Sequence, residues 1–292
     1  MNDSLTNTAL GVVLAYVLLL LVAVGINADT SQLSIINSTS VLWLKASQVL
    51  SVIVTFVLPS ILFVLLFTVE KWRYFLLHKF PSWKTIIIGV LIMPLALPFI
   101  NAMGEFNNQI SLPAVFSNIE IWMRAMENNA AILTEYFLKM DSVIDLAINL
   151  FVIAFMAAIT EELFFRGVLQ TVLIKATNIH IGVWGAAILF SAIHMQFYGF
   201  IPRAILGGVL GYMFIWSGSL WVPIIGHFVN NGAAVLLSYY IQKGAINKEI
   251  EHVGAAQDEL FIGLASLVVT IGLLALLKRN TLHSSTFTQG LH

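Results

Sequence analysis

The sequence predicts an all-α fold, a polytopic transmembrane helical bundle of about eight spans. Of the 292 residues, 59% are hydrophobic and only 10% are charged, whereas about 25% of the residues of an ordinary soluble domain are charged. Several stretches are long enough to cross a hydrocarbon core of roughly 30 Å. They are continuously apolar rather than alternating, which favours helices over a membrane β-barrel.

Eight apolar stretches are predicted as spans: Ala9–Ile26, Ala46–Val69, Thr85–Met103, Leu146–Ile174, Ile181–Tyr198, Ala204–Gly218, Leu220–Ile241 and Leu260–Leu277. No Lys or Arg precedes the first stretch, so we expect a retained span rather than a cleaved signal peptide. The uncharged run from Ala204 to Gln242 is too long for one crossing. The turn-forming residues Ser217, Gly218 and Ser219, followed by Pro223, predict a break there.

The basic residues predict the orientation. They gather after the second and the last span, at Lys71, Arg73, Lys79, Lys84, Lys278 and Arg279. The positive-inside rule puts both groups, and with eight spans both termini, in the cytoplasm. Three basic residues on the outer side run against this assignment: Arg203, Lys243 and Lys248.

The connection between the third and fourth spans, Asn101 to Asp145, is predicted to contain an amphipathic helical segment. Apolar residues recur there at helical spacing, and Glu120/Arg124 and Glu135/Lys139 are i,i+4 pairs. Such a segment either lies along the membrane surface, which we favour, or forms a soluble helical hairpin over the bundle.

Three regions are predicted along the chain. Residues 1–145 hold the N-terminal spans and the interfacial segment, residues 146–241 form the core that carries the candidate site, and residues 242–292 hold the last span and a polar tail after Arg279. The net charge of −1 offers no basic face for nucleic acid. The absence of cysteine excludes disulfides, thiolate nucleophiles and cysteine-ligated zinc.

Two adjacent carboxylates lie deep inside an apolar span. An ionised group at the bilayer centre costs several kcal/mol, so Glu161 and Glu162 predict a functional site. Glu162 and Arg166 are i,i+4 neighbours that can neutralise each other, whereas Glu161 points about 100° away on the helix. Glu161 therefore needs a partner from another helix.

Two histidines within spans are the candidate partners. His194 lies in the fifth predicted span, and His227 lies in the seventh, where it shares a helix face with Asn231 at i,i+4. Taken singly, a polar residue of this kind commonly forms only a hydrogen bond between helices. Small residues such as Gly207, Gly208 and Gly211 are interpreted as ordinary helix packing.

Together these side chains can activate water. A carboxylate in a low-dielectric cavity can act as general base, helped by one histidine, while a second histidine and an amide stabilise an oxyanion. That chemistry is amide hydrolysis. The alternative is a divalent metal such as zinc held by Glu161, His194 and His227, although no H-E-x-x-H motif is present.

The residues resemble the CPBP family, the CAAX prenyl protease and bacteriocin-processing intramembrane endopeptidases, also called Abi. The family pattern EExxxR, FxxxH and HxxxN reads here, in order, Glu161, Glu162 and Arg166; Phe190 and His194; His227 and Asn231. By position, the resemblance implies that Glu161 with His194 activates water and that His227 with Asn231 forms the oxyanion site. It assigns Glu162 and Arg166 a supporting role.

The resemblance implies an intramembrane endopeptidase, with membrane lipid and a peptide or lipidated protein substrate as partners. It also implies a bacterial cytoplasmic membrane as the location, with an internal eukaryotic membrane as the alternative. Two alternatives stay open. One is a non-catalytic scaffold or bacteriocin-immunity protein that keeps the fold. The other is a proton-coupled transporter, which ranks lower because no internal repeat is visible.

Overall fold

The structure is a computed structural model that describes residues 3–26, 38–69, 71 and 73–282. Over these residues it is helical, with turns and loops and without a strand, which confirms the predicted all-α class. Residues 283–292 of the predicted polar tail lie outside the described residues.

The described helices run in the order α1 (Asp3–Ile26), α2 (Ser38–Val52), η2 (Ile53–Val57), α3 (Leu58–Phe67), α4 (Trp83–Asn108), η3 (Ala114–Phe116), α5 (Ser117–Leu138), α6 (Val143–Asn149), η4 (Leu150–Met156), α7 (Ala157–Glu162), η5 (Leu163–Gln170), α8 (Thr171–Ala176), α9 (Ile179–Ala192), η6 (Phe197–Gly199), α10 (Phe200–Ser217), α11 (Trp221–Gln242), η7 (Lys248–His252), η8 (Gln257–Glu259) and α12 (Leu260–Leu282). The segments η2, η4 and η5 are π-helical, and the other η segments are 3₁₀ turns.

Six helical stretches among the described residues are long and apolar enough to cross a membrane: Leu5–Ala23, Val41–Phe67, Trp83–Asn108, Val143–Ala176, Phe197–Ser217 and Gln257–Asn280. Large apolar side chains such as Leu66 and Trp43 stay exposed on their outer faces. Lipid is the environment that tolerates such exposure. The protein is therefore an integral membrane protein.

The predicted count of eight spans is not confirmed. Of the eight stretches, α9 has only 14 residues, and α11 is not among the six spanning helices. The polar side chains of His227, Asn230 and Asn231 interrupt the apolar character of α11.

The predicted end of the fifth span at Tyr198 is wrong. Helix α9 ends at Ala192, and the chain turns through Met195, which has a positive φ of 53°. The Ser191 hydroxyl donates to the Phe200 carbonyl at 2.7 Å and ties this turn to the start of α10. The predicted break after Ser217 is correct, because Gly218 adopts the left-handed conformation with φ 64°.

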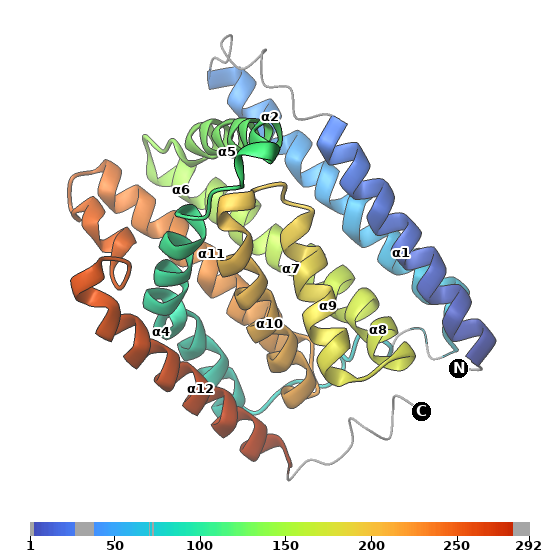
Figure 1. Ribbon diagram of the computed structural model, residues 1–292. Helices are drawn as coiled ribbons and strands as arrows, with labels where there is room; N and C mark the ends of the chain where they lie inside the picture. The colour runs from blue at the N-terminus through green and yellow to red at the C-terminus, as the bar shows by residue number, and fades with distance from the viewer. Residues whose placement is uncertain (1–2, 27–37, 70, 72, 283–292) are drawn as a thin grey trace.

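The helices form a layered bundle. Figure 1 shows α1 with α2 along one side and α12 with α4 along the other, with α7, α9 and α10 between them. Helix α10 packs against α9, α4 and α12, and α11 packs against α4 and η4. The motif-bearing helices therefore occupy the interior of the bundle.

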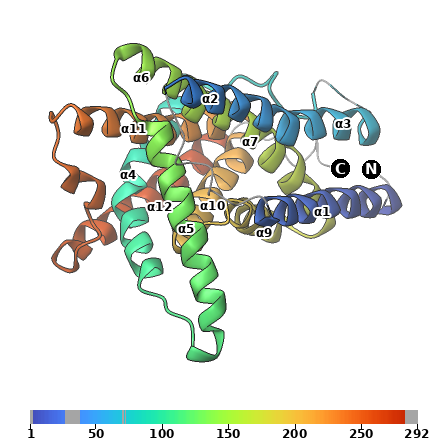
Figure 2. The same cartoon turned by 90° about the horizontal axis from the view of Figure 1, so that it is seen from above.

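Helix α5 runs crosswise to the long helices, as the views in Figures 1 and 2 show together. It is one 22-residue helix with no buried residue rather than a hairpin. The predicted pair between Arg124 and Glu120 forms at 2.8 Å. The pair between Glu135 and Lys139 does not form, because α5 ends at Leu138 and Lys139 is extended. Membrane contact of α5 stays a prediction.

The carboxylates lie in a nearly continuous helix from Val143 to Ala176, in which two π-helical segments flank α7. π-helical turns inside α-helices occur frequently at functional sites. The Thr171 hydroxyl donates to the Arg166 carbonyl at 3.0 Å, five residues earlier. The widened turns thus fall on both sides of Glu161 and Glu162.

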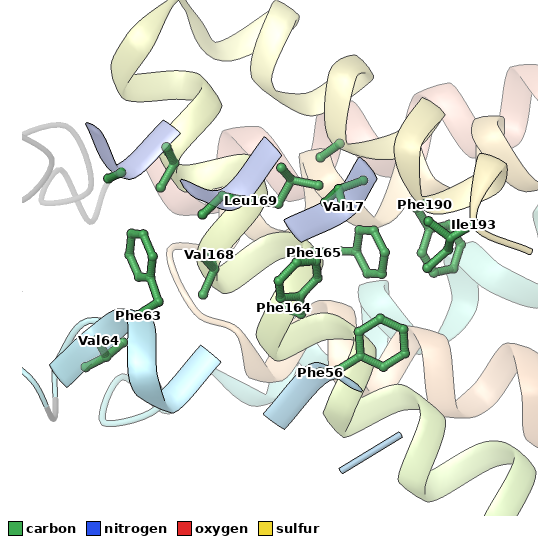
Figure 3. Packing of buried hydrophobic residues seen from close by; sticks show 14 of the residues in the cluster. Val17, Phe56, Phe63, Val64, Phe164, Phe165, Val168, Leu169, Phe190 and Ile193 are labelled. Carbon is green, nitrogen blue, oxygen red and sulfur yellow. The ribbon is translucent and has the colours of Figure 1, made fainter. Parts of the chain in front are cut away.

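An aromatic core supports this helix. Figure 3 shows Phe56, Phe164, Phe165 and Phe190 gathered where α2–α3, η5 and α9 meet. The Phe165 and Phe190 rings lie edge to face with centroids 5.0 Å apart, an arrangement that contributes about 0.5–1.5 kcal/mol beyond burial. The core therefore packs η5 firmly against α9 and the α2–α3 segment.

Glycines let α10 approach its neighbours closely, as the packing interpretation predicts. A Cβ at Gly207 would lie 3.1 Å from the Ala187 Cβ, and a Cβ at Gly211 would lie 2.6 Å from the Gln170 amide oxygen. The Gly211 carbonyl in turn accepts from the Gln170 amide nitrogen at 3.1 Å. Small residues at these positions are required for helix contact.

We expect Gly211→Ala to lower the free energy of unfolding by about 1–3 kcal/mol, the usual cost of overpacking. Thermal denaturation in detergent measures this loss. Gly272→Ala is the matched control, because a Cβ at Gly272 meets nothing within 4 Å. An unchanged melting temperature for Gly211→Ala would contradict the packing role.

Candidate active site

A buried ion pair lies at the centre of the candidate site. The Arg166 Nη1 donates to Glu162 Oε1 at 2.7 Å, and both side chains are almost fully buried. This is the i,i+4 pairing that the sequence predicts. Burial of two charges is costly, so the pair requires further hydrogen bonds.

Arg166 also connects helices that are distant in the sequence. Its Nη2 donates to the Gly207 carbonyl on α10 at 3.1 Å. Its guanidinium lies 4.9 Å from the centroid of the Phe190 ring on α9, a cation–π distance. Arg166 thereby joins η5, α9 and α10.

His227 brings α11 into the same cluster. Its Nδ1 lies 2.8 Å from Glu162 Oε1, the oxygen that also accepts from Arg166. Because a carboxylate oxygen accepts, we assign the ring proton to Nδ1 as donor. Its Nε2 then faces Glu161 Oε2 at 3.9 Å. The partner of Glu161 on another helix, which the sequence requires, is His227.

His194 lies next to this cluster. It follows the end of α9, and its Nδ1 contacts the Phe190 carbonyl at 2.7 Å. The Phe190 ring is 5.0 Å from the His194 ring and 6.1 Å from the His227 ring, between centroids. His194 has no hydrogen bond to Glu161 among the described contacts.

Asn231 is oriented toward the backbone. Its Nδ2 donates to the Ile153 carbonyl in η4 at 3.1 Å, and its Oδ1 accepts from the neighbouring Asn230 at 3.1 Å. Both asparagine side chains therefore interact with each other, and Asn231 links α11 to the widened turn before α7.

Two features of the site have no counterpart in the sequence prediction. The shared use of Glu162 by Arg166 and His227 depends on the packing of α11 against α7. The other is Arg203 in the first turn of α10, which interacts electrostatically with Glu161 and His194. A signal existed for Arg203, because it is the only charged residue between Lys175 and Lys243.

A metal does not fit the residues as they are arranged. Within the residues that the structure describes, no group of three or more His, Asp or Glu side chains is placed to hold a metal ion. The alternative of zinc held by Glu161, His194 and His227 therefore receives no support from the geometry.

The fold and the site together define the class of protein. It is a polytopic helical membrane protein in which carboxylates and imidazoles lie close together between the helices. Comparison with protein families then identifies residues 143–233 as a match to the family described as "Type II CAAX prenyl endopeptidase Rce1-like". The match contains all three motifs and confirms the resemblance to the CPBP family over this stretch.

A curated relative is similar over a shorter stretch. The "Uncharacterized protein YpbD" of Bacillus subtilis (strain 168) is 40% identical over 76 residues, which are 25% of this chain and 36% of that protein. The similarity thus covers about a third of the relative's length. No solved structure matches the chain.

We expect Arg166→Ala to destabilise the protein by about 3–5 kcal/mol, because it leaves the buried Glu162 charge without its partner. Thermal denaturation of the purified variant and its level of membrane insertion measure the effect. Arg124→Ala is the control, since it removes an exposed pair on α5 whose loss costs little. Unchanged thermal stability of the Arg166 variant would refute the supporting role.

Proposed function

We propose that the protein is an intramembrane endopeptidase that hydrolyses a peptide bond with water activated by Glu161. The observation that carries this proposal is the Glu161–His227 pair, 3.9 Å apart between Oε2 and Nε2. That separation is too long for a direct hydrogen bond and allows one water to contact both atoms at about 2.8 Å. The match to a family of endopeptidases supports the same reaction class.

The proposed catalytic set is Glu161, His194, His227 and Asn231, with Glu162 and Arg166 as positioning residues. Glu161 takes a proton from water as the hydroxyl oxygen bonds to the carbonyl carbon. The tetrahedral oxyanion accepts hydrogen bonds from an imidazole and the Asn231 amide. The C–N bond then breaks as the proton passes to the leaving amine. No other reactant is needed.

The contacts favour His227 over His194 as the imidazole next to the attacking water. Glu162 and Arg166 fix the His227 ring so that Nε2 faces Glu161. In that case the oxyanion falls to His194 and Asn231. Because the His194 Nδ1–H donates to the Phe190 carbonyl, its Nε2 donates to the oxyanion only when the ring is doubly protonated. The family pattern implies the opposite division, with His194 at the water and His227 at the oxyanion.

The substrate class is a peptide or lipidated protein that reaches the site from the membrane. Lipid and substrate are thus the proposed partners, and the bacterial cytoplasmic membrane with both termini inside is the proposed location. The rival function is a scaffold or immunity protein that uses the charged cluster for bundle specificity alone. Cleavage that depends on Glu161 separates these two functions.

We expect Glu161→Gln to abolish cleavage, a loss of at least about 10²-fold for a general base, while the protein still folds. The measurement compares new peptide termini in membranes from cells with the unaltered protein, with Glu161→Gln and with no protein, by mass spectrometry. Glu135→Gln on α5 is the control, because Glu135 is exposed and away from the site. Identical termini with and without the unaltered protein would favour the scaffold.

We expect His227→Ala and His194→Ala to lower cleavage in both cases but to differ in their effect on thermal stability. His227→Ala removes a bond between α11 and Glu162, so it lowers both cleavage and melting temperature. His194→Ala lowers cleavage and leaves the melting temperature nearly unchanged, because the His194 bond stays within its own helical end. Cleavage by His227→Ala at the unaltered rate would remove His227 from the catalytic set.

A further inference from the structure

Arg203 is an arginine beside the candidate site that the proposed reaction does not use. It lies one turn into α10, in the spanning stretch Phe197–Ser217. A cation inside a membrane span is costly and marks a functional position by default.

The guanidinium of Arg203 lacks a full set of acceptors. One of its terminal nitrogens, Nη2, donates to the Gln196 amide oxygen. The other, Nη1, is buried and has no hydrogen-bond partner. Arg124 and Arg166 each contact a carboxylate at 2.8 Å or less, but Arg203 forms no ion pair among the described residues. A buried donor without an acceptor costs about 1–3 kcal/mol, and more when it is charged.

The backbone around Arg203 is firmly held. The Asn107 side chain on α4 donates to the Phe197 carbonyl at 3.0 Å and accepts from the Ile201 amide at 2.7 Å. The Glu127 carboxylate on α5 accepts from the Tyr198 amide at 3.0 Å. Gly199 leaves the guanidinium room, since a Cβ there would lie 3.3 Å from Nη2. A rigid frame thus positions an incompletely bonded cation.

The guanidinium of Arg203 lies near two members of the proposed catalytic set. It interacts electrostatically with Glu161, with His194 and with Glu127. Glu161 already has His227 as its imidazole neighbour at 3.9 Å. The Nη1 atom, which has no hydrogen-bond partner among the described residues, is therefore available to an acceptor on a molecule that enters the site.

We infer that Arg203 binds a carboxylate of the peptide substrate, so that the enzyme selects peptides that carry a negative charge close to the scissile bond. This inference rests on the proposed endopeptidase function. Guanidinium and carboxylate match as paired donors and acceptors. The carboxylate comes from the peptide C-terminus or from an acidic side chain, and the chemistry of recognition is the same.

A lipid phosphate is the less favoured occupant. The Nη1 atom is buried within the protein, whereas headgroup phosphates stay in the interfacial layer. The electrostatic partners of Arg203 also include Glu161 and His194, which belong to the proposed catalytic set.

The test uses binding, with cleavage blocked. Purified full-length Glu161→Gln protein in detergent is incubated with a mixed-sequence apolar peptide library. Each sequence is present as free acid and as C-terminal amide, and with Glu or Gln at one internal position. Captured peptides are quantified by mass spectrometry. The same experiment uses Glu161→Gln combined with Arg203→Met, with Arg203→Lys and, as matched control, with Arg124→Met.

We expect carboxylate-bearing peptides to be enriched at least about tenfold over their neutral partners, which corresponds to about 1.4 kcal/mol. The enrichment disappears with Arg203→Met, is partly kept with Arg203→Lys and is unchanged with Arg124→Met, whose residue is paired with Glu120. Enrichment in the acid/amide pairs identifies the terminal carboxylate, and enrichment in the Glu/Gln pairs identifies a side chain.

Three outcomes would overturn the inference. The first is equal capture of charged and neutral peptides by the Glu161→Gln protein in which Arg203 is unchanged. The second is unchanged enrichment with a folded Arg203→Met protein. Capture of no peptide by a correctly folded protein overturns the proposed endopeptidase function and the inference together. The first two outcomes overturn the inference alone, so the two failures are distinguishable.

Discussion

The carboxylate of Glu162 is the constraint on which the rest of the site depends. One of its oxygens accepts from Arg166 and from His227, and Arg166 extends the network to the Gly207 carbonyl and the Phe190 ring. Four helical elements therefore converge on one buried charge. Within a membrane the hydrophobic effect does not drive helices together, because lipid is as apolar as their side chains. Hydrogen bonds such as these and close packing hold the helices together instead. The network also sets the ring of His227, so stability and chemistry share the same atoms.

The arrangement assigns different tasks to two neighbouring carboxylates. One oxygen of Glu162 accepts from two fixed donors, whereas Glu161 forms no hydrogen bond among the described residues and faces an imidazole nitrogen at 3.9 Å. Adjacent residues on a helix point about 100° apart, so the first carboxylate faces the space between helices while the second faces the core. This division explains why the chain keeps two acids and one arginine in a single span, an uneven charge balance that a purely structural pair does not require.

The sequence predicts much of this site because its strongest signals are local. The Glu162/Arg166 pairing follows from helical spacing, and the break at Gly218 follows from turn chemistry. The contacts that it does not predict depend on tertiary packing. The early end of α9 depends on a turn through Met195 and a bond from Ser191 to Phe200, and the contact of His227 with Glu162 depends on where α11 docks. Arg203 was visible as an isolated charge, but its missing acceptor emerges only in three dimensions.

The helix that bears both acids has a consequence for the surrounding lipid. Its 34 residues from Val143 to Ala176 extend at most about 50 Å at the α-helical rise of 1.5 Å per residue, whereas the acyl-chain layer is only about 30 Å thick. A rod of this length tilts strongly, or its ends emerge into the headgroups, or the bilayer thickens around it. Hydrophobic mismatch then couples the depth of the two acids to the thickness of the host bilayer, so acyl-chain length becomes a physical control on how deep in the membrane they lie.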